Sequence, residues 1–150
     1  LSFESEIQSD CAPLTAPVQA LLAAGLEIHC LRDLTRGGLA TSLVEIAESA
    51  KLALAIDAAK VPVNELVQGA CEILGLDPLY VANEGRFVCI LPAAQAQQAV
   101  EIINRTTPES AAVIIGSVKP GPAGQVTQRS IIGAERIVDR LSGEQLTRSC

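Results

Sequence analysis

The chain has 150 residues, of which 49% are hydrophobic and 2% aromatic, and its formal net charge at pH 7 is −6. This length suffices for one domain with a buried core. The negative charge argues against nucleic acid and anionic membrane surfaces as partners, because both attract a basic protein face. No apolar run is long enough to span a membrane, and no signal peptide opens the chain.

The sequence contains no methionine, so we interpret it as part of a longer protein. Cysteines stand at positions 11, 30, 71, 89 and 150, without a C-x-x-C pair. An odd number without that spacing indicates neither a disulfide framework nor a zinc site. We therefore predict reduced thiols, a cytoplasmic location and no metal held by the cysteines.

The first half begins with irregular residues up to 14, followed by a predicted helix over 15–24 and a strand over 27–31. A polar turn at 32–38 precedes apolar residues at helical spacing, which predict a long helix to Ala50. His29, the sole histidine of the chain, lies on the predicted strand and is interpreted as structural.

In the second half we predict a strand over 52–57, then a helix over 65–74 that Asn64 caps, a strand over 86–91 and a helix over 92–104. A strand over 111–118 and a hairpin-like pair of extended segments over 125–130 and 131–138 follow. Residues 141–150 are polar and lack periodicity, which predicts a mobile tail after a globular domain of residues 1–140. Strands that alternate with helices early and pair late predict an α+β fold, with helices on one face of a mixed or antiparallel sheet.

Two adjacent glycines, Gly37 and Gly38, stand where the long helix is predicted to begin. Glycines at a helix N-terminus let a phosphate approach the backbone N–H groups, and the helix dipole favours an anion there. Arg36 would add donors, and Asp33 would hold a magnesium ion or orient Thr35. Alternatively, the glycines start a tightly packed helix that Asp33 or Thr35 caps. Both interpretations remain open on this stretch alone.

A second candidate site is the polar turn Asn83-Glu84-Gly85, which leads into a predicted strand. A carboxylate at the rim of a cleft gains basicity from partial burial, which suits Glu84 to act as a general base. The alternative is a surface turn with a solvated side chain.

The chain ends on Cys150, and a thiol at a terminus has no packing role that explains it. As a carrier arm, the ten residues from Leu141 would span roughly 30 Å when extended. Arg148 favours the nucleophilic thiolate, whereas the terminal carboxylate opposes it. An incidental or disulfide-forming end is the alternative.

Several stretches together resemble the C-terminal half of the HypE family of hydrogenase expression/formation proteins. They are residues 9–13, 31–39, 77–85 and 132–146, followed by the terminal cysteine. The glycine stretch alone would indicate only the wider superfamily of aminoimidazole ribonucleotide synthetase and selenophosphate synthetase. This chain has Leu34 where the family usually has proline, and it ends Thr-Arg-Ser-Cys rather than Pro-Arg-Ile-Cys.

The resemblance implies a full-length homodimer that uses ATP and Mg²⁺, with an N-terminal domain, absent here, that supplies much of the ATP site and the dimer contact. In this family the carbamoyltransferase HypF loads a carbamoyl group on the terminal thiol. ATP-dependent dehydration converts it to a thiocyanate, and the cyano group passes to iron on the HypC–HypD complex for the [NiFe]-hydrogenase centre. The isolated chain is expected to be inactive and to bind ATP weakly or not at all.

Carried onto this sequence, the resemblance implies that Cys150 is the carrier thiol and Glu84 the base, in a pocket shaped by Asn83 and Gly85. The phosphate side would be lined by Asp33, Thr35, Arg36, Gly37 and Gly38. Two alternatives stay open: another ATP-dependent synthetase of the superfamily, which needs no terminal thiol, and a docking module for maturation partners without catalysis.

Overall fold

The computed structural model describes residues 7–108, 111–130 and 132–140. In chain order the elements are α1 (Thr15–Ala23), β1 (Cys30–Leu34), α2 (Gly38–Ala50), β2 (Ala53–Asp57), the 3₁₀ turn η1 (Ala58–Lys60), α3 (Glu65–Leu74), the 3₁₀ turn η2 (Pro78–Tyr80), β3 (Asn83–Ile90), α4 (Ala93–Thr106), β4 (Gly116–Lys119), β5 (Val126–Arg129) and β6 (Glu135–Val138). None of the helices in these ranges is long and apolar enough to cross a membrane.

The strands form two sheets. β1 and β3 make an antiparallel pair, and the other four strands lie in the order β4-β2-β5-β6. Within the larger sheet, β2 runs antiparallel to β4 and parallel to β5, and β5 and β6 form an antiparallel hairpin.

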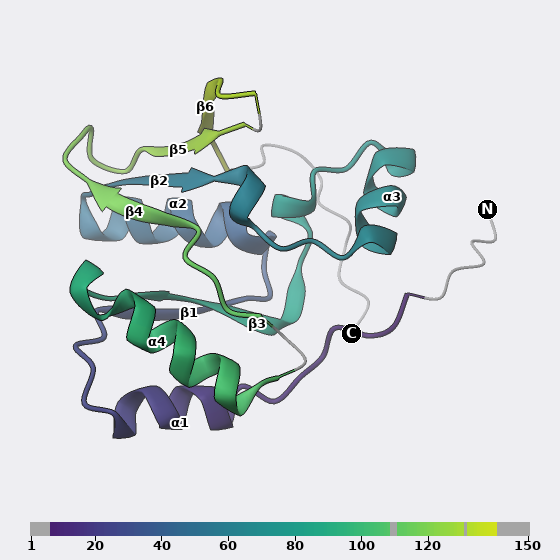
Figure 1. The fold of residues 1–150 in the computed structure, drawn as a ribbon. Coiled ribbons are helices and arrows are strands. Elements are labelled where there is room, and N and C mark those ends of the chain that lie inside the picture. The colour runs from purple at the N-terminus through teal and green to yellow at the C-terminus, as the bar shows by residue number, and fades with distance from the viewer. Residues whose placement is uncertain (1–6, 109–110, 131, 141–150) are drawn as a thin grey trace.

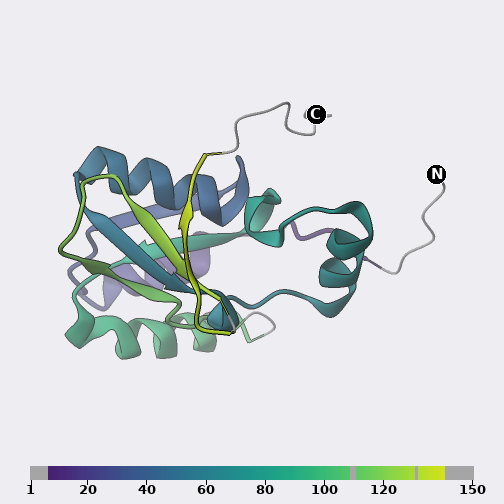
Figure 2. The ribbon, with the colours of Figure 1, turned by 90° about the horizontal axis from the view of Figure 1, so that it is seen from above.

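Helix α2 lies between the two sheets and carries the core. Its residues Leu39, Leu43 and Ala47 are buried at helical spacing, and they join a cluster with Leu54 and Val126 of the larger sheet. Figures 1 and 2 show α2 on one side of the β1–β3 pair and the layer of α1 and α4 on the other.

Helices α1 and α4 pack on each other through small and apolar side chains. Leu21 of α1 is fully buried and Ala99 of α4 is 3% exposed. The Glu27 N–H donates to Gln95 Oε1 at 2.8 Å, which ties the end of this layer to the chain entering β1.

The α+β class and the mixed strand pairing are confirmed, with the strands divided between two sheets rather than in one. The predicted cap at Asn64 is confirmed, because its side chain accepts from the Leu66 N–H at 2.9 Å. The strand predicted over 111–118 is shorter: β4 is an edge strand of four residues, Gly116–Lys119, and its ladder with β2 ends at the Ile56–Gly116 pair. The predicted tail, 141–150, lies outside the described residues.

Candidate functional site

The turn between β1 and α2 is closed by backbone geometry. Gly37 and Gly38 have φ values of 65° and 63°, in the left-handed region that favours glycine. Gly37 is the N-cap of α2 and has no side chain to accept a hydrogen bond, so the predicted cap by Asp33 or Thr35 is wrong.

Gly38 is also required by close packing. A Cβ atom on it would lie 2.5 Å from the carbonyl oxygens of both Leu79 and Val81. The turn η2 and the residue after it therefore press directly on the first residue of α2. Since Leu79 is buried in the main core, the start of the helix and η2 form one packed unit.

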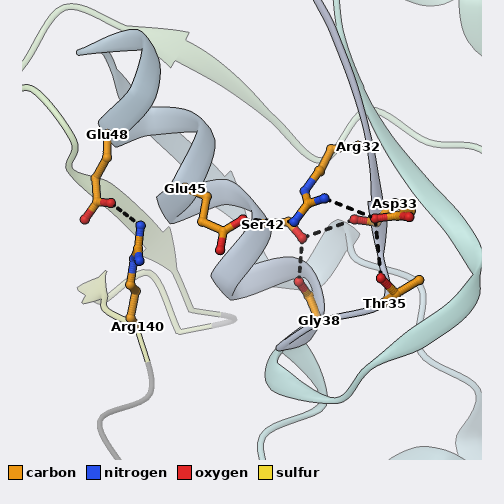
Figure 3. A network of polar contacts seen from close by, with 8 residues as sticks. All are labelled: Arg32, Asp33, Thr35, Gly38, Ser42, Glu45, Glu48 and Arg140. Atoms are coloured by element: carbon orange, nitrogen blue, oxygen red, sulfur yellow. Dashed lines mark hydrogen bonds and ion pairs between the residues drawn. The ribbon is translucent and has the colours of Figure 1, made fainter. Parts of the chain in front are cut away.

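A polar network surrounds this turn, as Figure 3 shows. The buried Ser42 hydroxyl shares its single proton between the Gly38 carbonyl oxygen at 2.9 Å and the Asp33 carbonyl oxygen at 3.2 Å. Arg32 reaches Glu45 at 2.9 Å and Asp33 at 3.4 Å, and the Thr35 hydroxyl makes a long contact of 3.5 Å to Asp33 Oδ1. These contacts join the end of β1 to the first turns of α2, on the two sides of the turn.

Arg36 differs from its neighbours because its side chain is exposed and makes no hydrogen bond or ion pair with any other described residue. Asp33 is exposed as well, and both of its side-chain contacts go to Oδ1. The turn thus presents one guanidinium and one carboxylate oxygen to solvent beside a helix N-terminus.

Asn83, Glu84 and Gly85 begin β3, so the prediction of a turn at these residues is wrong. The pairing is irregular here: Leu34 lies opposite Asn83, whereas the preceding Asp33 lies opposite Phe87. Residues 84–86 therefore stand outside the register of the β1–β3 ladder. A bulge of this kind directs side chains away from the regular strand.

The segment before α1 covers this bulge. Asp10 Oδ2 accepts a hydrogen bond from the Glu84 N–H at 3.1 Å, which satisfies a donor that the ladder leaves free. A Cβ on Gly85 would lie 1.9 Å from the Asp10 carbonyl oxygen and 3.1 Å from Ala12. Asp10 is thus a residue of the site to which the sequence assigned no role, although the stretch 9–13 belongs to the family pattern.

The fold brings the two predicted sites together. The Leu34–Asn83 pairing joins the residue before Thr35 to the residue before Glu84, and the contact of Gly38 with Leu79 and Val81 joins the same two segments. Glu84 is exposed in this chain, as in the alternative of a solvated side chain. Cys150 lies outside the described residues.

Two of the other cysteines are poor nucleophiles. Burial raises the pKa of the Cys71 thiol, with a further contribution from Asp77, and burial also raises the pKa of the Cys89 thiol. Both thiols therefore remain protonated at neutral pH.

Two hollows of the surface lie away from this site. One, of about 270 Å³, lies on the larger sheet between Asp57, Lys60 and Arg129. The other, of about 580 Å³, lies between the second half of α2 and the end of β6, with Glu48 and Arg140 on its wall. Within the described part of the chain, no three histidine, cysteine or carboxylate side chains gather as a metal site.

The fold and the glycine turn define a class of protein. Residues 2–129 match the family described as AIR synthase related protein, C-terminal domain, and the chain belongs to that family. A phosphoribosylformylglycinamidine synthase II from Thermotoga maritima shares the fold, with a TM-score of 0.60 and 15% identity over 90% of this chain and 23% of that one.

Within that class the similarity is to HypE, which confirms the resemblance seen in the sequence. The chain is 48% identical to the carbamoyl dehydratase HypE of Rhodobacter capsulatus and 33% identical to that of Escherichia coli, each over the whole chain and 44% of the relative. A crystal structure of HypE in complex with ATP matches with a TM-score of 0.89 and 41% identity, over 97% of this chain and 45% of that one. A HypE–HypF complex matches with a TM-score of 0.85 and 40% identity, over 94% and 46%. The chain thus spans less than half the length of these relatives.

Proposed function

We propose that this chain is the C-terminal part of a carbamoyl dehydratase that acts in the maturation of [NiFe]-hydrogenase. The observation that carries the proposal is the meeting of the Gly37–Gly38 turn and the Glu84 segment along one strand pair, in a chain similar to HypE over its whole length. Dehydration of a carboxamide needs a phosphate site and a base side by side, and these two segments supply candidates for both.

The reaction we propose starts from a carbamoyl group on Cys150. Its oxygen attacks the γ-phosphorus of ATP, ADP leaves, and the nitrogen gives up one proton. Loss of phosphate then breaks the C–O bond, the second nitrogen proton leaves, and a thiocyanate remains on the sulfur. Glu84 would accept the nitrogen protons. Asn83 and Gly85 would shape its pocket, and the bulge directs this segment out of the ladder.

The phosphate side is assigned to Asp33, Thr35, Arg36, Gly37 and Gly38. Arg36 has no competing partner among the described residues, so its guanidinium is available to a phosphate. Mg²⁺ in such sites is bound by substrate phosphates and one or two carboxylates, and Asp33 Oδ2 is the oxygen this turn offers. The ion would neutralise phosphate charge during the transfer.

The similarity to HypE also suggests partners for the whole protein. HypF would load Cys150, since HypE and HypF occur together in a solved complex. The HypC–HypD complex would receive the cyano group, and the full-length protein would be a cytoplasmic homodimer. The exposure of Glu84 favours a second candidate function, in which this part serves as a docking module.

The test is the intact mass of the C-terminal peptide in the full-length protein. After incubation with HypF and carbamoyl phosphate, we expect a carbamoyl adduct on Cys150 that loses water only when ATP is added. Glu84→Gln should stall at the adduct, whereas Glu101→Gln, at an exposed glutamate of α4, should behave as the wild type.

An unmodified Cys150 under these conditions contradicts the carrier role and leaves the docking module or another synthetase of the superfamily. An adduct that dehydrates equally well in Glu84→Gln contradicts the assignment of the base alone.

A further inference from the structure

The bulge at the start of β3 leaves part of the backbone outside the β1–β3 ladder. Residues 84–86 stand between the partners of Leu34 and Asp33 and have no counterpart of their own on β1. A backbone group without a ladder partner needs another partner or water, and the segment that carries it is less constrained than a paired strand. The placement of the Glu84 side chain therefore depends on what else holds this backbone.

Two side chains accept hydrogen bonds from the N–H groups of the bulge. Asp10 Oδ2 accepts from the Glu84 N–H at 3.1 Å, and Asn83 Oδ1 accepts from the Gly85 N–H at 3.3 Å. The Asn83 contact is local, between residues two positions apart, whereas Asp10 stands 74 residues before Glu84. Asp10 therefore joins the bulge to another part of the molecule.

The main chain of Asp10 also contacts the bulge. A Cβ on Gly85 would lie 1.9 Å from the Asp10 carbonyl oxygen and 3.1 Å from the Ala12 backbone nitrogen. Asp10 thus meets two consecutive residues, Glu84 with its side chain and Gly85 with its main chain. Together these contacts set both the distance and the orientation of Asp10 relative to the bulge.

Helix α1 anchors the segment that carries Asp10. The helix begins at Thr15, five positions after Asp10, and its residues Pro17 and Leu21 are buried. Since α1 packs on α4, the segment approaches the bulge from an element that is fixed in the fold.

The Asp10–Glu84 contact lies at the surface, where it has little to do for stability. Both residues are exposed, and at an exposed site water replaces a lost hydrogen bond at a small net cost. A carboxylate is nevertheless a strong acceptor for a backbone N–H, because the bond is assisted by charge. The contact is therefore better suited to orient one peptide group than to hold the fold together.

We infer that Asp10 is a positioning residue for Glu84, the base of the proposed dehydration. It holds the peptide group from which the Glu84 side chain extends, and its own carboxylate takes no part in the reaction. Catalytic groups work only within a narrow range of distance and angle, and a displacement of about 1 Å can cost on the order of a hundredfold in rate. This inference rests on the proposed function.

The test uses the full-length protein carrying Asp10→Ala, which removes the acceptor. The carbamoylated protein is mixed with ATP, and the loss of water from the adduct is followed by mass over a single turnover. We expect the rate to fall about tenfold, because the Glu84 side chain is no longer held in one place. The dissociation constant of ATP, measured by calorimetry, should not change.

Asp10→Asn is the second variant, since its side chain keeps an oxygen that can accept from the Glu84 N–H and loses only the charge. Its rate should return to within about threefold of the wild type, as a neutral acceptor makes a weaker bond. Ser9→Ala is the matched control in the same exposed segment, because the Ser9 hydroxyl accepts from the Cys11 N–H at 3.3 Å. Its rate should equal that of the wild type.

Deuterium exchange at the amides of residues 84–86 reports the same contact without the reaction. In Asp10→Ala these amides should exchange about three- to tenfold faster than in the wild type, because an N–H without its acceptor is open to water. Asp10→Asn should stay close to the wild type, and Ser9→Ala should match it.

A wild-type rate in Asp10→Ala would overturn the inference, and so would unchanged exchange at residues 84–86. Equal losses of rate in Asp10→Ala and Asp10→Asn would overturn it as well, since the charge of Asp10 rather than its hydrogen bond would then matter. A merely structural role would weaken ATP binding together with the rate. A wild type that does not dehydrate its adduct would instead contradict the proposed function, and the inference with it.

Discussion

The Gly37–Gly38 turn and the Asn83–Gly85 segment meet at the β1–β3 pair, but different forces hold them. The glycine turn is held by buried contacts, with two carbonyl oxygens against Gly38 and the buried Ser42 hydroxyl on its backbone. The Asn83–Gly85 segment is held by an exposed piece of chain, through Asp10.

Because the two segments are held differently, substitutions in them should affect different properties of the protein. Close packing at the turn makes its backbone part of the core, so a change there is expected to act on folding. The Glu84 segment stands outside the ladder register and its side chain is exposed, so a change there should act on chemistry with less cost in stability. Four predictions test this contrast, from the largest expected effect to the smallest.

Gly38→Ala should destabilise the chain by about 2–5 kcal/mol, since it combines a left-handed backbone with a Cβ placed 2.5 Å from two carbonyl oxygens. The denaturation midpoint is the measurement. Gly69→Ala is the control, because that helical glycine has nothing within 4 Å of a new Cβ and should gain about 0.5–1 kcal/mol. Equal shifts of the denaturation midpoint in both variants would contradict the claim that Gly38 is required by close packing.

Gly85→Ala should cost about 1–3 kcal/mol, less than the change at Gly38. Its Cβ would meet the Asp10 carbonyl oxygen at 1.9 Å, but that segment is exposed and can move aside. Limited proteolysis should show faster cleavage near residues 9–13 in this variant. If Gly85→Ala proves as costly as Gly38→Ala, the segment belongs to the core after all.

Two neighbouring hydroxyls on α2 sharpen the contrast within the turn. Ser42→Ala should cost about 1 kcal/mol because the buried hydroxyl donates one hydrogen bond that two backbone carbonyls share. Thr41→Val should be neutral or stabilising by about 1 kcal/mol, since Thr41 Oγ1 is buried without a partner among the described residues. Denaturant melts of the two variants should therefore shift in opposite directions or differ by at least that amount.

The smallest expected effect is on the pH dependence of stability. It concerns Tyr80 in η2, the turn that packs on Gly38 and precedes the Asn83–Gly85 segment. Burial, with a contribution from Asp77, raises the pKa of Tyr80 above its usual value of 10.0. The folded state thus favours the protonated hydroxyl, so its contribution to stability is present below about pH 10 and is lost as the pH rises through the folded pKa. The chain has one tyrosine, so tyrosinate absorbance reports this group alone. A midpoint at or below 10 contradicts the half-buried placement of the ring, and Tyr80→Phe should lose this part of the pH dependence.

The sequence by itself determined the kinds of element and the family. Apolar residues at helical spacing placed α2 and α3, Asn64 marked a cap, and the Gly37–Gly38 pair marked the start of α2. These features depend on residues within one or two turns of each other, so local patterns report them.

Tertiary structure alone decided how the site is assembled. The jump in register that puts Glu84 in a bulge, the reach of Asp10 across 74 residues and the tie from Tyr80 to Asp139 all join distant parts of the chain. Contacts between distant parts of the chain also decided the exposure of Glu84, the division of the strands into two sheets and the shortness of β4. Each depends on which distant backbone groups remain free to pair once the core has formed, and no local pattern carries that information.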